Sequence, residues 1–173
     1  RVVDGERRIV GDPPLIVRIA DLVPPDESDQ VQDYVRGLIR MYRRTLSGDR
    51  CRLIERFRYV DIARKVVGVG SVGTRTWIVL LLGRDDDDPL FLQAKEAQAS
   101  VLESFLGKSQ FAQHGQRVVE GQRMMQAASD VMLGWERIAT IDGQKKDFYI
   151  RQLWNAKGSA EVELMKPGAL EGY

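Results

Sequence analysis

The chain has 173 residues, of which 43% are apolar and 29% are charged, and this composition excludes a chain that is disordered overall and is typical of a globular domain. Its formal net charge is +1, so the sequence as a whole produces no field that would attract nucleic acid or a membrane surface. The single cysteine, Cys51, cannot form a disulfide within these residues and fits a reducing compartment, so we predict a cytoplasmic protein.

Residues 1–57 are predicted to be mainly helical. A short extended run lies between the Pro-Pro pairs of residues 13–25. Apolar side chains then recur at helical spacing through residues 28–46, which predicts an amphipathic helix, and residues 49–57 predict a second, shorter one. The residues that set this spacing are Val31, Val35, Leu38, Tyr42 and Leu46.

From Tyr59 onward the sequence is typical of an α+β domain. Residues 59–67 and 74–82 are rich in β-branched and apolar residues, and residues 90–97 predict a third strand. Helices are predicted over residues 99–107 and 114–132, and two further strands are predicted on either side of Asp142-Gly143, a common hairpin turn. Met124 and Met125 are predicted to lie in the core.

Four aspartates, Asp85 to Asp88, lie between the second and third predicted strands. Clustered carboxylates are able to bind a cation, but the spacing fits no known calcium loop. We therefore predict a solvated turn here. His114, the single histidine, has no cysteine or carboxylate at ligand spacing, so we predict no metal site around it.

A glycine-rich stretch, VVGVGSVGTRTW, joins the first two strands and places Gly68, Gly70 and Gly73 at the spacing G-x-G-x-x-G. A dinucleotide-binding loop of this pattern must open a helix, but the residues after Gly73 are strand formers. The Gly-Lys-Ser/Thr end of a Walker A loop is also absent. A glycine hairpin between strands is typical of protein kinases, where backbone N–H groups bind the triphosphate. In such a site Ser71 would add a hydroxyl to the phosphate contacts. The alternative is a plain tight hairpin that binds no ligand.

Lys95 lies on the third predicted strand, where a protein kinase places the lysine that binds the α- and β-phosphates. Strand alternation puts Phe91, Gln93 and Lys95 on one face. The kinase lysine pairs with a helix glutamate, and we favour Glu120 over Glu103 because the longer helix has room to cross the sheet. A salt bridge at the sheet edge for Lys95, and a solvated position for Glu120, are the alternatives.

Four motifs, KVVGVGSVGTR, DPLFLQAKEA, GQRMMQAASD and FYIRQLWNAKGS, resemble the bacterial family known as domain of unknown function 2252, over residues 57–163. The resemblance implies a protein-kinase-like fold related to aminoglycoside phosphotransferases. It also implies an Asp-x-His-x-x-Asn motif and an acidic motif like the catalytic and metal-binding loops of small-molecule kinases, and this sequence contains neither. By the same analogy, Gln152 and Leu153 occupy the place of the adenine-contacting hinge.

Together these features predict a kinase N-lobe-like antiparallel sheet of about five strands with packed helices. We expect a helical segment (1–57) that packs on the rest of the protein, a nucleotide-binding lobe (58–163) and a tail or linker (164–173). Since the chain begins with Arg1 rather than Met, we interpret it as part of a longer protein that supplies the magnesium ligands.

The expected ligand is ATP with magnesium, and the expected activity of the whole protein is phosphoryl transfer to an unidentified small molecule or protein. We expect the 173 residues alone to be inactive. No membrane or nucleic-acid partner is expected. A non-catalytic, pseudokinase-like binding scaffold is the alternative.

Overall fold

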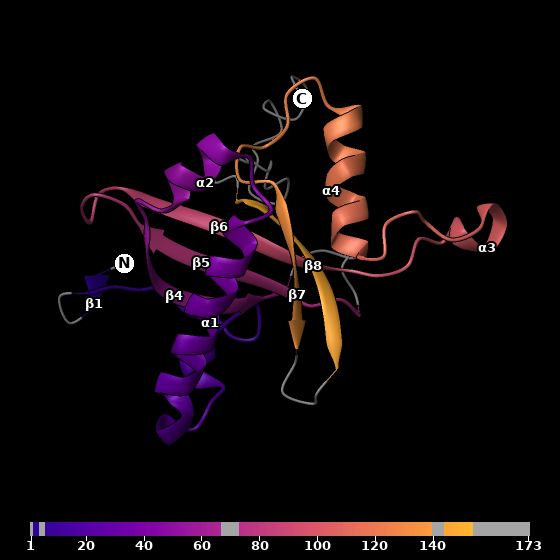
Figure 1. Cartoon of the computed structure of the whole chain (residues 1–173). Coiled ribbons are helices and arrows are strands. Elements are labelled where there is room, and N and C mark those ends of the chain that lie inside the picture. The colour runs from indigo at the N-terminus through magenta and orange to yellow at the C-terminus, as the bar shows by residue number, and fades with distance from the viewer. Residues whose placement is uncertain (1, 4–5, 67–72, 140–143, 154–173) are drawn as a thin grey trace, which may run out of the picture.

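A six-stranded antiparallel sheet forms the centre of the computed structural model, which describes residues 2–3, 6–66, 73–139 and 144–153 (Figure 1). Its strands, in spatial order, are β3 (Ile16–Arg18), β4 (Arg58–Lys65), β5 (Thr76–Leu82), β6 (Pro89–Ala97), β8 (Lys145–Gln152) and β7 (Gly134–Ala139). A separate ribbon pairs β1 (Val2–Val3) with β2 (Glu6–Arg7).

The helices lie between these strands in the sequence. They are α1 (Ser28–Arg43), α2 (Gly48–Ile54), α3 (Glu103–Leu106) and α4 (His114–Met125), and two 3₁₀ turns span Ile19–Asp21 and Pro25–Glu27. The helix predicted over residues 114–132 is shorter than expected: α4 ends at Met125, because Gln126 has an extended backbone conformation.

The sheet contains six strands where about five were expected. Strand β3 is the addition, and it extends the β4 edge by pairing Ile16 with Lys65 and Arg18 with Ala63. The short run between the proline pairs is thus part of the main sheet. The described part of the chain confirms a mixed α/β fold with an antiparallel sheet, and the division into segments 1–57, 58–163 and 164–173 stays a prediction.

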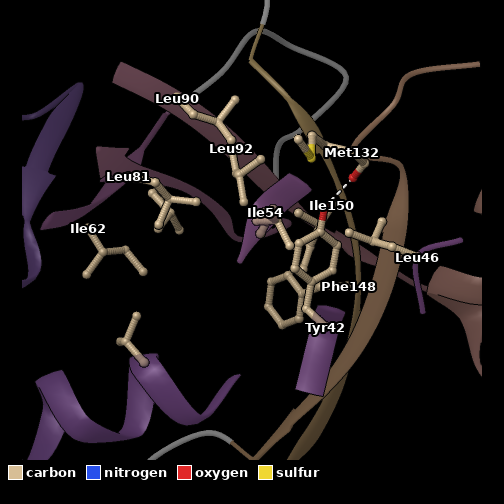
Figure 2. Close-up of a cluster of buried hydrophobic side chains, with 13 residues drawn as sticks. Tyr42, Leu46, Ile54, Ile62, Leu81, Leu90, Leu92, Met132, Phe148 and Ile150 are labelled. Atoms are coloured by element: carbon tan, nitrogen blue, oxygen red, sulfur yellow. Dashed lines mark hydrogen bonds between the residues drawn. The ribbon is translucent and has the colours of Figure 1, made fainter. Parts of the chain in front are cut away.

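One face of the sheet, here called the α1 face, carries the larger apolar core (Figure 2). Tyr42 of α1 is almost fully buried there, and its hydroxyl donates a hydrogen bond to the carbonyl of Met132. Side chains from the helices, the strands and the turn after α1 pack around it, including Leu46, Ile54, Ile62, Leu81, Leu90, Leu92, Phe148 and Ile150. Burial raises the pKa of the Tyr42 phenol, so the hydroxyl remains a donor at any ordinary pH.

The opposite face, here called the α4 face, combines a smaller apolar cluster with the packing of α4 against β7 and β8. Ala63, Ile78, Leu80 and Leu82 form the buried apolar part. The residues of β6 alternate as predicted, since Leu92 and Ala94 belong to the α1 core while Phe91 packs against the second cluster. Lys95 therefore shares the α4 face with Phe91 and Gln93.

The prediction that Met124 and Met125 lie in the core is wrong. Met124 and Met125 are 76% and 81% exposed, because they lie in the last turn of α4, where the helix ends. The helix predicted over residues 99–107 is reduced to the short α3, and its Phe105 and Leu106 are more than three-quarters exposed. Figure 1 shows the reason: α3 lies at the end of an arm that extends away from the sheet.

Candidate functional site

The glycine-rich stretch falls mostly outside the described residues, which include Gly73 but not Gly68, Gly70 or Ser71. Gly73 has φ +81°, a left-handed conformation that favours glycine. Strand β5 begins at Thr76, so a strand and not a helix follows the glycines, as the sequence predicts. The dinucleotide-binding arrangement, in which a helix holds the pyrophosphate, is thereby excluded.

Lys95 lies at the end of the sheet to which the glycine-rich stretch is attached. Its direct neighbours across the strands are Thr76 on β5 and Tyr149 on β8. Thr76 is only three residues beyond Gly73, so the lysine and the last glycine are close in the fold. The Lys95 side chain is half-buried, and the Thr76 hydroxyl is buried without a hydrogen-bond partner among the described groups.

Helix α4 covers the same face as Lys95. The backbone N–H of His114 donates to Asp147 Oδ2 at 2.8 Å, and Asp147 lies on the α4 face of β8. Further along the helix, the Arg123 guanidinium lies 5.7 Å from the centre of the Trp135 ring. Trp135 is opposite Tyr149, which is opposite Lys95, so the helix and the lysine occupy neighbouring parts of one surface.

Of the two candidate partners for Lys95, Glu120 lies on this packed helix. Its carboxylate forms an ion pair with Arg123 at 3.1 Å, one turn along. Glu103 belongs to α3, and its carboxylate accepts a hydrogen bond from the Ser100 amide. The structure thus puts Glu120 on the same side of the sheet as Lys95, while the pairing of these two residues stays a prediction.

Asp147 fixes the start of α4 against the sheet. Besides the His114 amide, it accepts hydrogen bonds from Arg137 Nε at 2.5 Å and from an Arg137 terminal nitrogen at 3.0 Å. Burial opposes ionisation of Asp147, but the Arg137 and His114 hydrogen bonds outweigh burial and hold its pKa below the ordinary value. An ionised carboxylate therefore positions the helix that carries Glu120.

Two polar residues of the α4 face were given no role in the sequence analysis. Gln93 is buried on β6, and Arg151 is directly opposite it on β8. Nε and a terminal nitrogen of Arg151 donate to the Gln93 Oε1 atom at 3.4 and 3.3 Å. The alternation of β6 pointed to Gln93, but only the pairing of β6 with β8 brings Arg151 next to it.

The two residues predicted at a hinge lie at the end of β8, where Gln152 is its last residue and Leu153 follows it. The Gln152 amide donates to Asp130 Oδ2 at 3.0 Å, and the Leu153 amide donates to the Phe91 carbonyl at 2.8 Å. Leu153 also packs against the apolar cluster of the α4 face. Both backbone donors are thus occupied by protein groups, and the contact of these residues with a ligand stays a prediction.

The aspartate turn makes ion pairs and binds backbone groups. Asp86 lies 3.3 Å from Arg58 and Asp87 lies 2.6 Å from Arg7, while Asp88 accepts from the Arg84 amide. Among the residues that the structure describes, no group of three or more potential ligand side chains could hold a metal ion.

An apolar cavity of about 660 Å³ lies on the α1 face, between α1 and the sheet, with Val35, Trp77 and Ile138 in its wall. Trp77 is opposite Ala94 of the α1 core, so this cavity is on the other side of the sheet from Lys95. It is therefore separate from the candidate site.

The sequence profile of a family described as uncharacterized protein conserved in bacteria (DUF2252) matches residues 1–173. The chain belongs to this family. The match includes residues 1–56, which precede the four motifs that resemble this family. No curated protein and no solved structure matches this DUF2252 chain. None of its described helices combines the length and apolar character that crossing a membrane requires.

Proposed function

We propose that this DUF2252 chain is the nucleotide-binding part of a kinase-like phosphotransferase. The observation that carries the proposal is the position of Lys95, which lies on the strand after a glycine-linked strand pair, next to Thr76 and on the face covered by α4. Protein kinases use these same parts: a glycine-rich loop over the phosphates, a lysine on the third strand and a glutamate on the following helix.

The proposed ligand is ATP with magnesium. Lys95 would bind the α- and β-phosphates, and backbone amides of the stretch around Gly68, Gly70, Ser71 and Gly73 would bind their oxygens, because small residues allow close approach of the backbone. Magnesium would neutralise phosphate charge. In this proposal the metal ligands and the catalytic base come from protein segments outside these 173 residues.

Glu120 is proposed to orient Lys95. Its present partner is Arg123 on the same helix, and an i,i+3 surface pair of this kind is worth only a few tenths of a kcal/mol. A weak pair of this sort leaves Glu120 able to change partners when a nucleotide brings Lys95 into its bound position. The Gln152–Leu153 segment is proposed to border the base.

Titration calorimetry with Mg-ATP tests the proposal, using the wild type, Lys95→Met and a matched control, Lys108→Met. Lys108 is exposed in the segment after α3, so its loss removes the same charge far from the sheet. We expect Lys95→Met to weaken binding by about tenfold or more, the cost of one charge-assisted hydrogen bond, and Lys108→Met to bind normally. Equal binding by wild type and Lys95→Met would remove Lys95 from the site, and no binding by the wild type would end the ATP proposal.

A binding scaffold without catalysis is the second candidate. It is favoured by the sequence itself, in which no Asp-x-His-x-x-Asn motif occurs and the single histidine, His114, begins α4. Tight Mg-ATP binding by the complete protein, without ATP consumption in the presence of candidate acceptors, would support the scaffold. Phosphoryl transfer would exclude it.

A further inference from the structure

Arg151 lies on the same face of the sheet as Lys95, and among the described residues it forms no ion pair with an acidic side chain. Arg151 is half-buried on β8, and its guanidinium donates its hydrogen bonds to Gln93, a neutral amide. Burying a charged group without an opposite charge costs free energy that must be recovered elsewhere. A guanidinium in this situation is suited to an anion.

Three carboxylates that the structure describes on the α4 side of the sheet pair with other arginines. Asp61 pairs with Arg18 at 3.1 Å. Asp147 pairs with Arg137 at 2.5 Å. Glu120 pairs with Arg123. In the described part of the chain, none of these acids is within salt-bridge distance of Arg151, so its positive charge adds to the field of this surface.

Arg151 is also placed to act together with Lys95. The register pairs Lys95 with Tyr149 and Gln93 with Arg151, so the two cations are diagonal neighbours on adjacent strands and share one face. Diagonal neighbours are about 7–8 Å apart at their backbones, a gap that both long side chains can bridge to meet a common ligand. A chain of two or three phosphoryl groups presents anionic oxygens over a comparable length.

Gln93 gives the arginine a defined position. Gln93 is 4% exposed, and its Oε1 atom accepts from two nitrogens of one guanidinium at 3.4 and 3.3 Å, which orients the fork. The Arg151 side chain is then held in one orientation, and its other N–H groups can donate to phosphate oxygens, which arginine binds through parallel hydrogen bonds. The buried Thr76 hydroxyl, opposite Lys95, adds a further polar group to the same row.

We propose that Arg151 and Lys95 together bind one polyphosphate chain, with Gln93 as the residue that positions Arg151. This inference rests on the proposed function for the identity of the ligand, ATP, but its chemistry requires only a linear polyphosphate. It makes Arg151 a phosphate-binding residue, and it predicts that the base contributes nothing to the Arg151 contact.

Calorimetric titration with two probes, Mg-ATP and inorganic tripolyphosphate, tests the inference on the wild type, Arg151→Gln and Arg151→Lys. We expect Arg151→Gln to weaken both probes by about tenfold or more, since a charge-assisted hydrogen bond is lost. Arg151→Lys retains the charge but loses the fork, so its effect should be intermediate. Arg84→Gln, in the exposed aspartate turn, is the matched control and should change neither affinity.

A variant of Gln93 tests whether this residue positions Arg151 for the phosphate chain. Gln93→Leu fills the same space without the amide oxygen, so tripolyphosphate binding should fall several-fold while Arg151 itself is present. If Gln93 had only a structural role, Gln93→Leu would lower the thermal stability of the protein. The folded variant would still bind tripolyphosphate with the wild-type affinity. Thermal unfolding of each variant therefore accompanies the titrations.

The possible outcomes are distinct. Weakened ATP binding with unchanged tripolyphosphate binding in Arg151→Gln would place the arginine at the base and overturn the inference. Wild-type affinity in Arg151→Gln, or no tripolyphosphate binding by the wild type, would also overturn it. If the wild type binds tripolyphosphate through Arg151 but does not bind ATP, the polyphosphate site stands and the proposed nucleotide function fails.

Discussion

Two glycines in α4 should respond in opposite directions to the same substitution, alanine. Gly115 lies in the first turn, where a Cβ atom would come within 2.2 Å of the Phe148 carbonyl oxygen. Gly121 lies in the middle of the helix, where a Cβ would meet nothing within 4 Å. The glycine with a close backbone neighbour is therefore Gly115, whereas Gly121 has open space around its Cα atom.

The magnitude follows from the contact. Ordinary carbon–oxygen contacts are about 3.3–3.6 Å, so Gly115→Ala forces the start of α4 away from β8 by roughly 1 Å. That movement stretches the hydrogen bond from the His114 amide to Asp147. Overpacking of this kind costs about 1–3 kcal/mol, and the helix propensity of alanine returns at most about 1 kcal/mol. We expect a net loss of about 1–2 kcal/mol for Gly115→Ala and a gain of about 0.5–1 kcal/mol for Gly121→Ala.

Urea denaturation followed by far-ultraviolet circular dichroism measures both free energies of unfolding, with an unchanged m-value as the check that the two-state comparison holds. Because both substitutions add the same methyl group to one helix, differences in intrinsic propensity largely cancel. A Gly115→Ala protein as stable as the wild type would show that α4 does not approach β8 as closely as the structure describes. Destabilisation by Gly121→Ala would refute the open surface at that position.

Two further substitutions test the groups that hold the helices on the sheet. Asp147→Asn should lower the free energy of unfolding by about 2–4 kcal/mol at neutral pH, because it removes the charge that Arg137 pairs with. Folding lowers the pKa of Asp147 from its ordinary value of 3.8. The stabilisation by its carboxylate is therefore complete at pH values above the unfolded-state pKa and is lost as the pH falls through the folded-state pKa. On acidification the wild type should lose this contribution, whereas Asp147→Asn has none to lose. Denaturation at a series of pH values compares the two slopes, and parallel slopes would contradict this assignment. Tyr42→Phe should cost about 1–3 kcal/mol in a thermal or urea melt, because the buried Met132 carbonyl loses its donor, and a neutral result would mean that another group satisfies it.

The strands were readable from the sequence because their signal is local. The β-branched runs of β4 and β5, and the alternation of β6, fix which side chains share a face whatever the neighbouring strand is. The strand formers after Gly73 likewise decided against a dinucleotide loop before any tertiary contact was known. Strand β3 was seen only as a short extended segment, since three residues give too little periodicity to assign a partner.

The candidate site was predictable only in part. Lys95 and Glu120 were found because the kinase pattern assigns a role to a strand lysine and a helix glutamate. Arg151 was missed because its significance comes from its register against Gln93, 58 residues away in the sequence. Met124 and Met125 were misplaced because apolar character indicates burial only where another element covers the helix.

The sequence by itself therefore determined the strands from β4 onward, the turn at Gly73 and the face of β6 on which Lys95 lies, since all three depend on the conformational preferences of neighbouring residues. Only the tertiary structure decided that β8 lies between β6 and β7, that α4 covers the Lys95 face and that Arg151 lies diagonally across from the lysine. Those relationships join segments far apart in the chain, and they are set by the packing of whole elements against one another, for which no local pattern supplies the register.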